Sequence, residues 1–154
     1  MSVSRAAPGE AEIERALWSL RGYDAMALAT VTDGGPHVAG VFFAPERIDD
    51  RLRLIIATLG DTALSRALRD DARVAFMCSP GNASRWIQGE GFAEVVDDAY
   101  RHADLHERLM AHAPGAREYV ERFDTVPAII HLQRLKIVEA IDAEPLLLEF
   151  DGDG

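Results

Sequence analysis

Hydroxyl and guanidinium side chains gather in residues 58–74, TLGDTALSRALRDDARV, within an otherwise acidic chain. A hydrophobic strand is expected to end at Thr58, and a short helix should run from about residue 61 to residue 69. Thr62 stands at the start of this helix, and Ser65 and Arg66 lie one turn inside it. A helix start attracts anions through its unpaired N–H groups and the positive end of its dipole. The segment therefore predicts a site for an anion such as a phosphate.

A plainer interpretation of the same residues stays open. The side-chain oxygen of Asp61 or Thr62 can cap the helix by accepting a hydrogen bond from an unpaired backbone N–H. A carboxylate at Asp61 would compete with an anion for those N–H groups, and Arg66 and Arg69 would be solvated. In this interpretation the helix only connects two strands.

Histidine and cysteine offer other chemistry. His102 and His106 are four residues apart, which places both imidazoles on one face of a helix, where they could share a metal. No Glu stands where the zinc protease motif needs one and no third ligand is evident, so a solvated helix face is favoured and no metal site is predicted. Cys78 alternates with Phe76 along a strand, which favours an inert buried thiol.

The composition bounds the possible functions. The chain has 154 residues, which suits one domain, and a formal net charge of -10, which argues against nucleic acid as a partner. Cys78 is the only cysteine, so no internal disulfide can form, and a reducing, cytoplasmic location is expected. The first residues have no apolar core, and no apolar run reaches the length of a membrane span, so neither a signal peptide nor membrane association is predicted.

The elements that would position these side chains are mostly antiparallel strands. Strands are expected at 25–32, 37–44, 51–58, 73–78, 85–96 and 128–141, and helices at 10–20, 61–69, 99–113 and 114–123. The sequences DGGP at 33–36 and PERIDD at 45–50 are typical of turns. The order predicts a six- or seven-stranded barrel with helices packed outside. We assign residues 1–9 to a flexible tail, 10–144 to a single domain and 145–154 to a C-terminal tail.

In order and spacing, these segments resemble the FMN-binding split-barrel family that includes pyridoxine/pyridoxamine 5′-phosphate oxidase. The resemblance covers residues 12 to about 142 and rests on LATVTDGGPHVAGVFF, LIIAT and ALRDDARVAF. It implies a mainly β split barrel, and a homodimer that binds FMN in the cleft between its chains. The implied activity is that of a flavin-dependent oxidoreductase acting on a small molecule. Because the flavin carries the hydride chemistry, no catalytic acid or base is named.

The resemblance also implies how the flavin phosphate is held. Thr58 matches the Thr that closes the family's third strand, and Thr62 matches the Ser at the helix start. The family's basic positions fall on Ala39, Ala63 and Leu64, so three charge-assisted donors are missing here.

Other residues could replace part of that phosphate site. Ser65 and Arg66 lie in the helix, and Arg69 and Arg85 could reach the same region. In the family the fifth strand begins near the cofactor, so Trp86 could stack on the ring. Alternatively, Trp86 packs under the loop at 79–84.

Three alternatives to an FMN enzyme remain. GEGFAEVVDD and HAPGAREYVERF resemble the family's haem-degrading branch, for which His37, His112 and His131 are candidate axial ligands, although VEAIDAEPLLLEF replaces that branch's Gly-rich ending. The chain could instead be a non-catalytic binding module that has lost its phosphate-binding residues. A deazaflavin could also take the place of FMN. An absorbance spectrum of the purified protein separates flavin, haem and neither.

Overall fold

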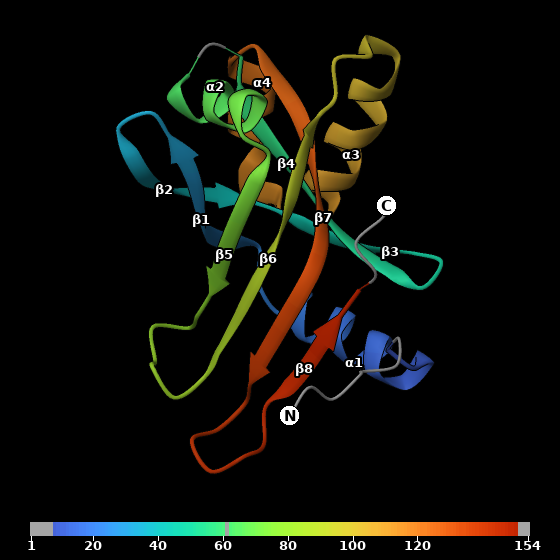
Figure 1. The fold of residues 1–154 in the computed structure, drawn as a ribbon. Helices are drawn as coiled ribbons and strands as arrows, with labels where there is room; N and C mark the ends of the chain where they lie inside the picture. The colour runs from blue at the N-terminus through green and yellow to red at the C-terminus, as the bar shows by residue number, and fades with distance from the viewer. Residues whose placement is uncertain (1–7, 61, 151–154) are drawn as a thin grey trace.

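The computed structural model describes residues 8–60 and 62–150, which form one antiparallel sheet with four α-helices around it (Figure 1). The helices are α1 (Glu10–Leu20), α2 (Ala63–Asp70), α3 (His102–His112) and α4 (Arg117–Arg122). The strands are β1 (Ala25–Thr32), β2 (Gly35–Phe42), β3 (Ala44–Ile48), β4 (Arg51–Leu59), β5 (Arg73–Cys78), β6 (Trp86–Val95), β7 (Thr125–Val138) and β8 (Leu146–Glu149). Short 3-10 turns, Ala99–Arg101 and Pro114–Ala116, precede α3 and α4.

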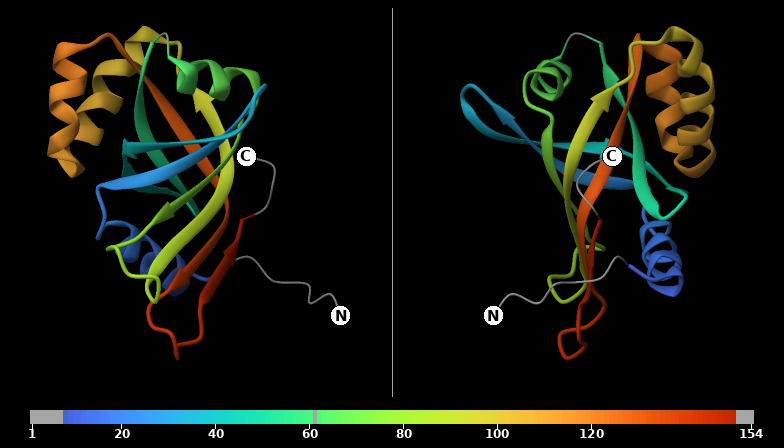
Figure 2. Two further views of the ribbon diagram at one scale, coloured as in Figure 1. Left: turned by 90° about the vertical axis from the view of Figure 1, so that its left-hand side faces the viewer. Right: turned by 45° about the vertical axis from the view of Figure 1, so that its right-hand side comes forward.

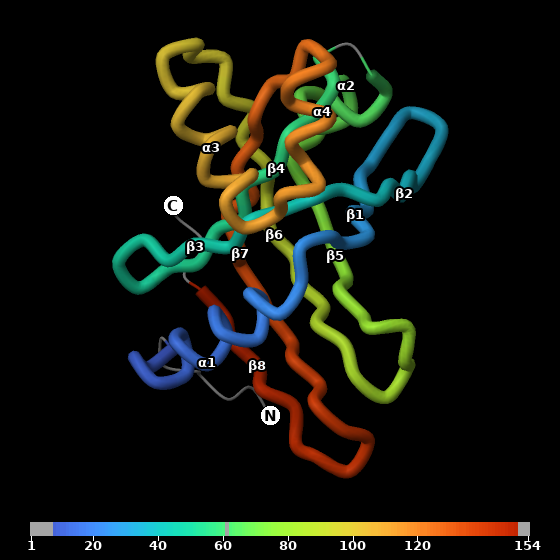
Figure 3. The backbone as a smooth tube through the Cα atoms, turned by 180° about the vertical axis from the view of Figure 1, so that it is seen from behind, coloured from blue at the N-terminus to red at the C-terminus, as the bar shows by residue number. Residues whose placement is uncertain are grey.

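The sheet has the strand order β2-β1-β5-β6-β7-β4-β3, and β8 pairs with β7. It is strongly twisted and curls around a common core, with α1 at one end, α2 at the other, and α3 and α4 packed outside (Figure 2). The trace seen from behind shows the same separation of α1 from α2 (Figure 3). The predicted mainly β split barrel is therefore confirmed, with eight strands rather than six or seven.

One predicted turn is a strand. Residues 45–50 were expected to form a turn because of Pro45 and two aspartates, but Ala44–Ile48 form β3 and pair with β4. β3 is the last strand on its side of the sheet path, and an edge strand tolerates a proline that donates no hydrogen bond. The turn is confined to the end of this segment, where Asp49 adopts a φ of 55°, a left-handed conformation that Asp tolerates.

The C-terminal tail predicted at 145–154 is wrong for its first part. Leu146–Glu149 form β8, and Leu148 and Phe150 are buried in the main core. Alternate residues of this segment face inward, as in any half-buried strand. The backbone N–H of Phe150 also donates to the carbonyl of Gln133. Gln133 has no partner on β6, because Glu90 pairs with Arg134 and the next residue, Gly91, pairs with Leu132.

Two apolar clusters hold the elements together. The larger fills the barrel and includes the inner face of α1, formed by Ile13, Ala16, Leu17 and Leu20. The smaller packs α3 against the outer side of β4 and β7, through residues such as Leu109. None of the helices in the described part of the chain is both long enough and apolar enough to cross a membrane.

Candidate functional site

Thr62 is the N-terminal cap of α2. Its hydroxyl oxygen accepts from the backbone N–H of Ser65 at 3.3 Å and donates to the carbonyl of Leu59 at 3.0 Å. The other predicted cap, Asp61, lies outside the described residues. Thr62 therefore caps the helix, as the interpretation of α2 as a plain connector expects. Its hydroxyl proton already makes a hydrogen bond within the chain.

A cavity of about 480 Å³ adjoins this helix start. Its walls come from the ends of β1, β2 and β4, the first turn of α2, the helices α3 and α4, and the start of β7. The polar side chains in the lining are those of Thr58, Thr62, Thr125, His37 and Tyr119, and the rest of the lining is apolar. Among the residues that the structure describes, no Arg or Lys lines the cavity. The site therefore offers hydroxyl groups and apolar surface, but no fixed positive charge.

Aromatic rings form one side of the cavity. Phe42 and Tyr119 both line it, and their ring centroids lie 6.0 Å apart at an interplanar angle of 56°. Tyr119 in turn contacts Phe123 at 6.2 Å. A Cβ at Gly115 would lie 2.8 Å from Cζ of Phe42, so only glycine leaves the Phe42 ring in this position. A flat ligand beside these rings could make tilted or offset aromatic contacts with them, which are favourable.

The structure brings only part of the predicted cofactor site together. Thr58 and Thr62 line the cavity, and so do Ala63 and Leu64, two of the positions where the family has basic residues. Ser65, a residue of α2, is buried and lies outside the lining. Its hydroxyl has no hydrogen-bond partner among the described residues. Arg66 is exposed and also lies outside the lining.

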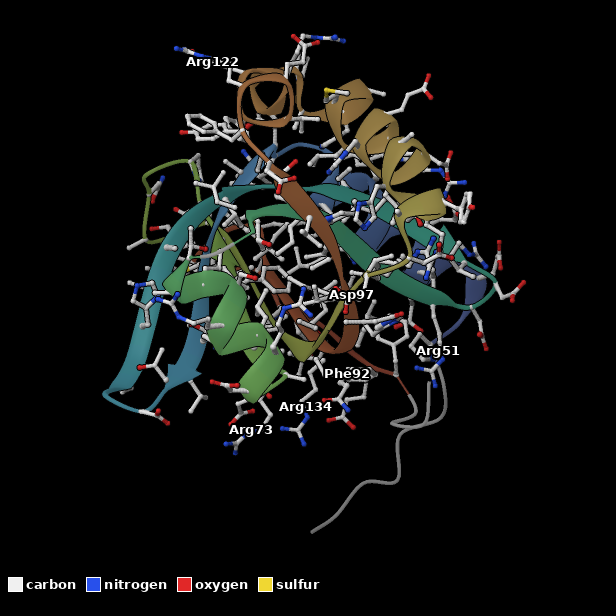
Figure 4. All side chains as sticks on the ribbon, turned by 90° about the horizontal axis from the view of Figure 1, so that it is seen from above. Arg51, Arg73, Phe92, Asp97, Arg122 and Arg134 are labelled. Carbon is white, nitrogen blue, oxygen red and sulfur yellow. The ribbon has the colours of Figure 1, made fainter. Side chains whose placement is uncertain are left out.

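Arg69 is held by an acidic partner. Its guanidinium forms a two-point salt bridge with Asp97, which follows β6 and lies beside α2 in the view from above (Figure 4). Hydrogen bonds from Arg69 lower the pKa of the Asp97 carboxyl. Asp98, the next residue, caps the 3-10 turn before α3 through the N–H of Tyr100. Arg69 is therefore neither a free surface cation nor a wall of the cavity.

Arg85 and Trp86 lie in another part of the molecule. Both line a separate cavity formed with Trp18 and Tyr23 at the α1 end of the barrel, whereas α2 is at the opposite end (Figure 1). β6 begins at Trp86 and runs the length of the barrel before it reaches the α2 side. Within one chain, these two residues are not part of the cavity that Thr58 and Thr62 line.

The paired histidines each contact an oxygen of the chain. Nε2 of His102 lies 2.6 Å from the carbonyl of Val96, and Nε2 of His106 lies 3.2 Å from Oγ1 of Thr125. Within the described ranges, no three His, Cys, Asp or Glu residues are grouped so that they could hold a metal ion. Burial lowers the pKa of His106, and the nearby His102 lowers it further.

The histidines proposed as haem ligands are scattered. His37 lines the main cavity, whereas Nε2 of His112 lies 2.7 Å from the carbonyl of Tyr23 and Nε2 of His131 lies 2.9 Å from Glu94. Cys78 is buried, and burial raises the pKa of its thiol to about 12, which agrees with the predicted inert residue.

Sequence reasoning missed several residues of the cavity. Phe42, Tyr119 and Thr125 line it from β2, α4 and the start of β7. Phe42 and Tyr119 lie in segments that carry the family resemblance, but neither was singled out as a site residue. Phe42 lies within the strand expected at 37–44, but only the packing of α4 against that strand shows its role. The aromatic residues of the short helix at 114–123 were the available signal, because exposed rings on a short amphipathic helix often face a ligand or a partner.

The fold and the cavity define a class: a split β-barrel with a cofactor-sized cavity at the N-terminus of the short helix after the fourth strand. A family model described as pyridoxamine 5′-phosphate oxidase matches residues 14–138, and the chain belongs to this family. No curated protein sequence matches the chain.

Solved structures share the fold at low sequence identity. The general stress protein 26 of Bacillus anthracis is 18% identical with a TM-score of 0.64, and the match covers 91% of this chain and 97% of that one. An FAD-binding protein from Mesorhizobium loti is 15% identical with a TM-score of 0.63, covering 79% and 88%. A heme-binding protein from Mycobacterium smegmatis is 17% identical with a TM-score of 0.67, covering 94% of this chain and 60% of the longer protein.

Proposed function

We propose that this protein binds a flavin, FMN in the first instance, in the main cavity and acts as an oxidoreductase on a small molecule. The observation that carries the proposal is the 480 Å³ cavity that joins the first turn of α2 to an aromatic wall. Such a volume is within the range of small-molecule and cofactor sites. Membership of the family and the FAD-binding relative support the same class of ligand.

The residues present fit the ring better than they fit the phosphate. Phe42 and Tyr119, with the apolar lining, suit an isoalloxazine ring, and Thr125 adds a hydroxyl group to the lining. For a phosphate, the N–H groups of Ala63 and Leu64 are the first two of α2, which have no partner within the helix. The helix dipole adds a partial positive charge there. A bound flavin would supply the electron transfer, and these residues would position it and exclude water.

The uncharged lining supports a second candidate. Charge-assisted hydrogen bonds are about twice as strong as neutral ones, and a phosphate here would find none from a side chain. A module that binds a neutral planar ligand without catalysis is therefore the alternative that the cavity favours. Haem remains a third possibility through His37, the one proposed axial ligand in the lining.

A second copy of the chain would complete the site. In an antiparallel pair, directly opposed residues share a face. Ala27 faces Gly40 and Met77, and Ala29 faces Val38 and Ala75, so the outer side of β2-β1-β5 carries small and apolar side chains. Val38 is 64% exposed and Met77 48% exposed.

This outer face continues into the cavity. Gly40 belongs to this face and also lines the cavity. The next pair along the same two strands is Ala25 and Phe42, and Ala25 lines the cavity too. A partner packed on β2-β1-β5 would therefore form part of the cavity wall. We infer a homodimer that buries over roughly 2,000 Å² in total, the range of obligate homodimers.

The first experiment is an absorbance spectrum of the purified protein, followed by titration of cofactor-free protein with FMN. Flavin bands, or saturable binding with quenching of flavin fluorescence, support the flavin proposal. A Soret band supports haem. The absence of both bands, together with no binding of added FMN, would overturn the flavin proposal in favour of the binding module.

A further inference from the structure

Thr125, at the start of β7, joins the main cavity to a histidine outside its lining. The Thr125 side chain is buried and lines the cavity. Its Oγ1 lies 3.2 Å from Nε2 of His106, a half-buried residue of α3, the helix that packs on the outer side of β4 and β7. The hydroxyl therefore links the cavity to a group that can carry a positive charge.

The position of Thr125 is close to the start of α2. Thr125 pairs with Leu59 across β4 and β7, and the carbonyl of Leu59 accepts the hydrogen bond from Thr62, the cap of α2. A phosphate bound by the first N–H groups of α2 would therefore have the hydroxyl of Thr125 nearby.

The three threonines of the lining use their hydroxyl protons differently. Thr58 and Thr62 each donate to a backbone carbonyl, at 3.2 and 3.0 Å. Among the described residues, the hydroxyl of Thr125 contacts only the imidazole of His106. Its proton is therefore the one that can turn toward a ligand.

The protonation state of His106 decides which way that proton points. A neutral imidazole can either accept a hydrogen bond at Nε2 or donate one from it, whereas an imidazolium can only donate. When His106 is charged, Oγ1 of Thr125 accepts this bond, and the hydroxyl proton needs another acceptor. An anionic group in the cavity is such an acceptor, and a hydrogen bond backed by a charge is stronger than a neutral one.

The charges around His106 keep it neutral in the absence of a ligand. Burial lowers the pKa of His106, and His102, whose ring centroid is 6.1 Å away on the same helix, lowers it further. His102 interacts in turn with Asp97, which is paired with Arg69, and Asp124, just before β7, is exposed. An anion bound beside the pair would raise the pKa of the imidazole, because an opposite charge favours the protonated form.

We propose that His106, acting through the hydroxyl of Thr125, supplies positive charge to an anionic group bound in the main cavity. The inference rests on the proposed function, in which that group is the phosphate of FMN. His106 is a positioning residue, since only Thr125 reaches the ligand. Its charge comes from behind the cavity wall and offsets part of what Ala63 and Leu64 do not provide. Because binding and protonation are linked, FMN should bind more tightly as the pH falls.

Titrations of the cofactor-free protein with FMN and with riboflavin, at pH 8 and pH 5.5, test the proposal by fluorescence quenching. FMN should bind about fivefold more tightly at the lower pH, since a ligand that raises the proton affinity of one group about tenfold gains at most about that factor itself. Riboflavin, which lacks the phosphate, should show no such gain. In NMR spectra of the full chain, the titration of the His106 imidazole should move to higher pH with FMN and stay in place with riboflavin.

Variants of the pair separate the charge from the hydroxyl. His106→Gln keeps a hydrogen-bonding side chain without the charge, and Thr125→Val removes the hydroxyl, so both should lose the gain at low pH. Thr125→Ser should keep it. His131→Gln is the matched control, because His131 contacts Glu94 outside the cavity lining, and this variant should behave as the parent protein does.

The outcomes distinguish this inference from the proposed function. FMN binding without a gain at low pH, a gain that survives in His106→Gln or Thr125→Val, or an equal gain for riboflavin would overturn the role of His106 and leave the flavin site standing. Binding of neither flavin by the parent protein at either pH would overturn the proposed function and this inference with it.

Discussion

The guanidinium of Arg69 donates two hydrogen bonds to the carboxylate of Asp97, with N–O distances of 2.9 and 2.8 Å. This pair joins the last turn of α2 to the segment between β6 and α3. It also removes Arg69 from the set of cations available to a phosphate. Arg85 lies at the far end of the barrel, so within one chain neither arginine adds a positive charge to the start of α2.

Leu64→Lys should restore the missing charge. Leu64 lines the cavity in the first turn of α2, so an ammonium group there can reach a phosphate held by the helix N-terminus. A charged hydrogen bond contributes about 1.5–3 kcal/mol, so FMN should bind at least about tenfold more tightly. Riboflavin, which lacks the phosphate, should bind as before, and Leu64→Met should change neither ligand. An equal gain for both flavins, or no gain, would show that the phosphate is not at this helix.

Arg66→Ala should be nearly silent. Arg66 is exposed and lies outside the cavity lining, so both FMN affinity and the stability of the cofactor-free protein should change by no more than about 0.5 kcal/mol. Fluorescence titration and thermal melting measure the two quantities. A marked loss of FMN affinity with unchanged melting would instead place Arg66 at the anion and return the helix to a phosphate-binding role.

Thr62→Ala should differ from that variant, because Thr62 is both the cap of α2 and part of the cavity wall. The loss of the cap should lower stability by about 1 kcal/mol. Thr62→Ser keeps the hydroxyl and should retain most of the stability. Denaturant unfolding of the cofactor-free protein gives the comparison, and equal stability for Thr62→Ala and the parent protein would contradict the capping role.

Gly115→Ala should impair binding of a flat ligand. The new Cβ would lie 2.8 Å from Cζ and 2.9 Å from Cε1 of Phe42, so the ring must move within the cavity wall. We expect weaker flavin binding by a titration of fluorescence quenching, with a small effect on folding because the displaced atoms are the end of a side chain. Gly34→Ala is the control, since its Cβ would meet only Oγ1 of Thr32 at 3.9 Å. Unaltered flavin affinity in Gly115→Ala would argue against a ring beside Phe42.

His106 should make stability depend on pH. Burial and the neighbouring His102 lower its pKa below the ordinary 6.5, so the folded state favours the neutral imidazole. The unfolded chain takes up the proton first as pH falls, and stability is therefore full above about pH 6.5 and decreases below it. His106→Gln should reduce the fall in melting temperature between pH 8 and pH 5.5. An identical fall in the parent protein and the variant would mean that other groups cause it.

Ala29→Glu tests the proposed dimer. Ala29 lies in the middle of the outer face of β2-β1-β5, and a carboxylate there would be buried in the partner's surface. We expect a dimer for the parent protein and a monomer for the variant by sedimentation, with weaker FMN binding because the proposed partner would complete the cavity. Ala111→Glu, at an exposed position of α3, should remain dimeric. A parent protein that is a stable monomer at micromolar concentration would contradict the interface.

Local signals in the sequence were sufficient for most elements of the fold. The alternation of β1, the turn that follows it, the helical spacing of α1 and α3, and the hydroxyl at the start of α2 all depend on neighbours within a few residues. Thr58 and Thr62 were identified in the same way, because the end of a strand and the cap of the next helix are close in sequence as well as in space. Two strands were missed: β3 contains Pro45, and β8 follows Pro145. They form strands because β4 offers an unpaired edge to β3, and β7 offers one to β8.

The tertiary structure alone decided which distant side chains meet. It placed Arg85 and Trp86 at the α1 end of the barrel, since β6 spans the molecule and its start cannot lie beside α2. It paired Arg69 with Asp97, and it brought Tyr119 to the cavity by packing α4 across β2. Residue types and spacing state what a side chain can do, but closure of the barrel brings together residues far apart in the chain, and no local pattern encodes which of them become neighbours.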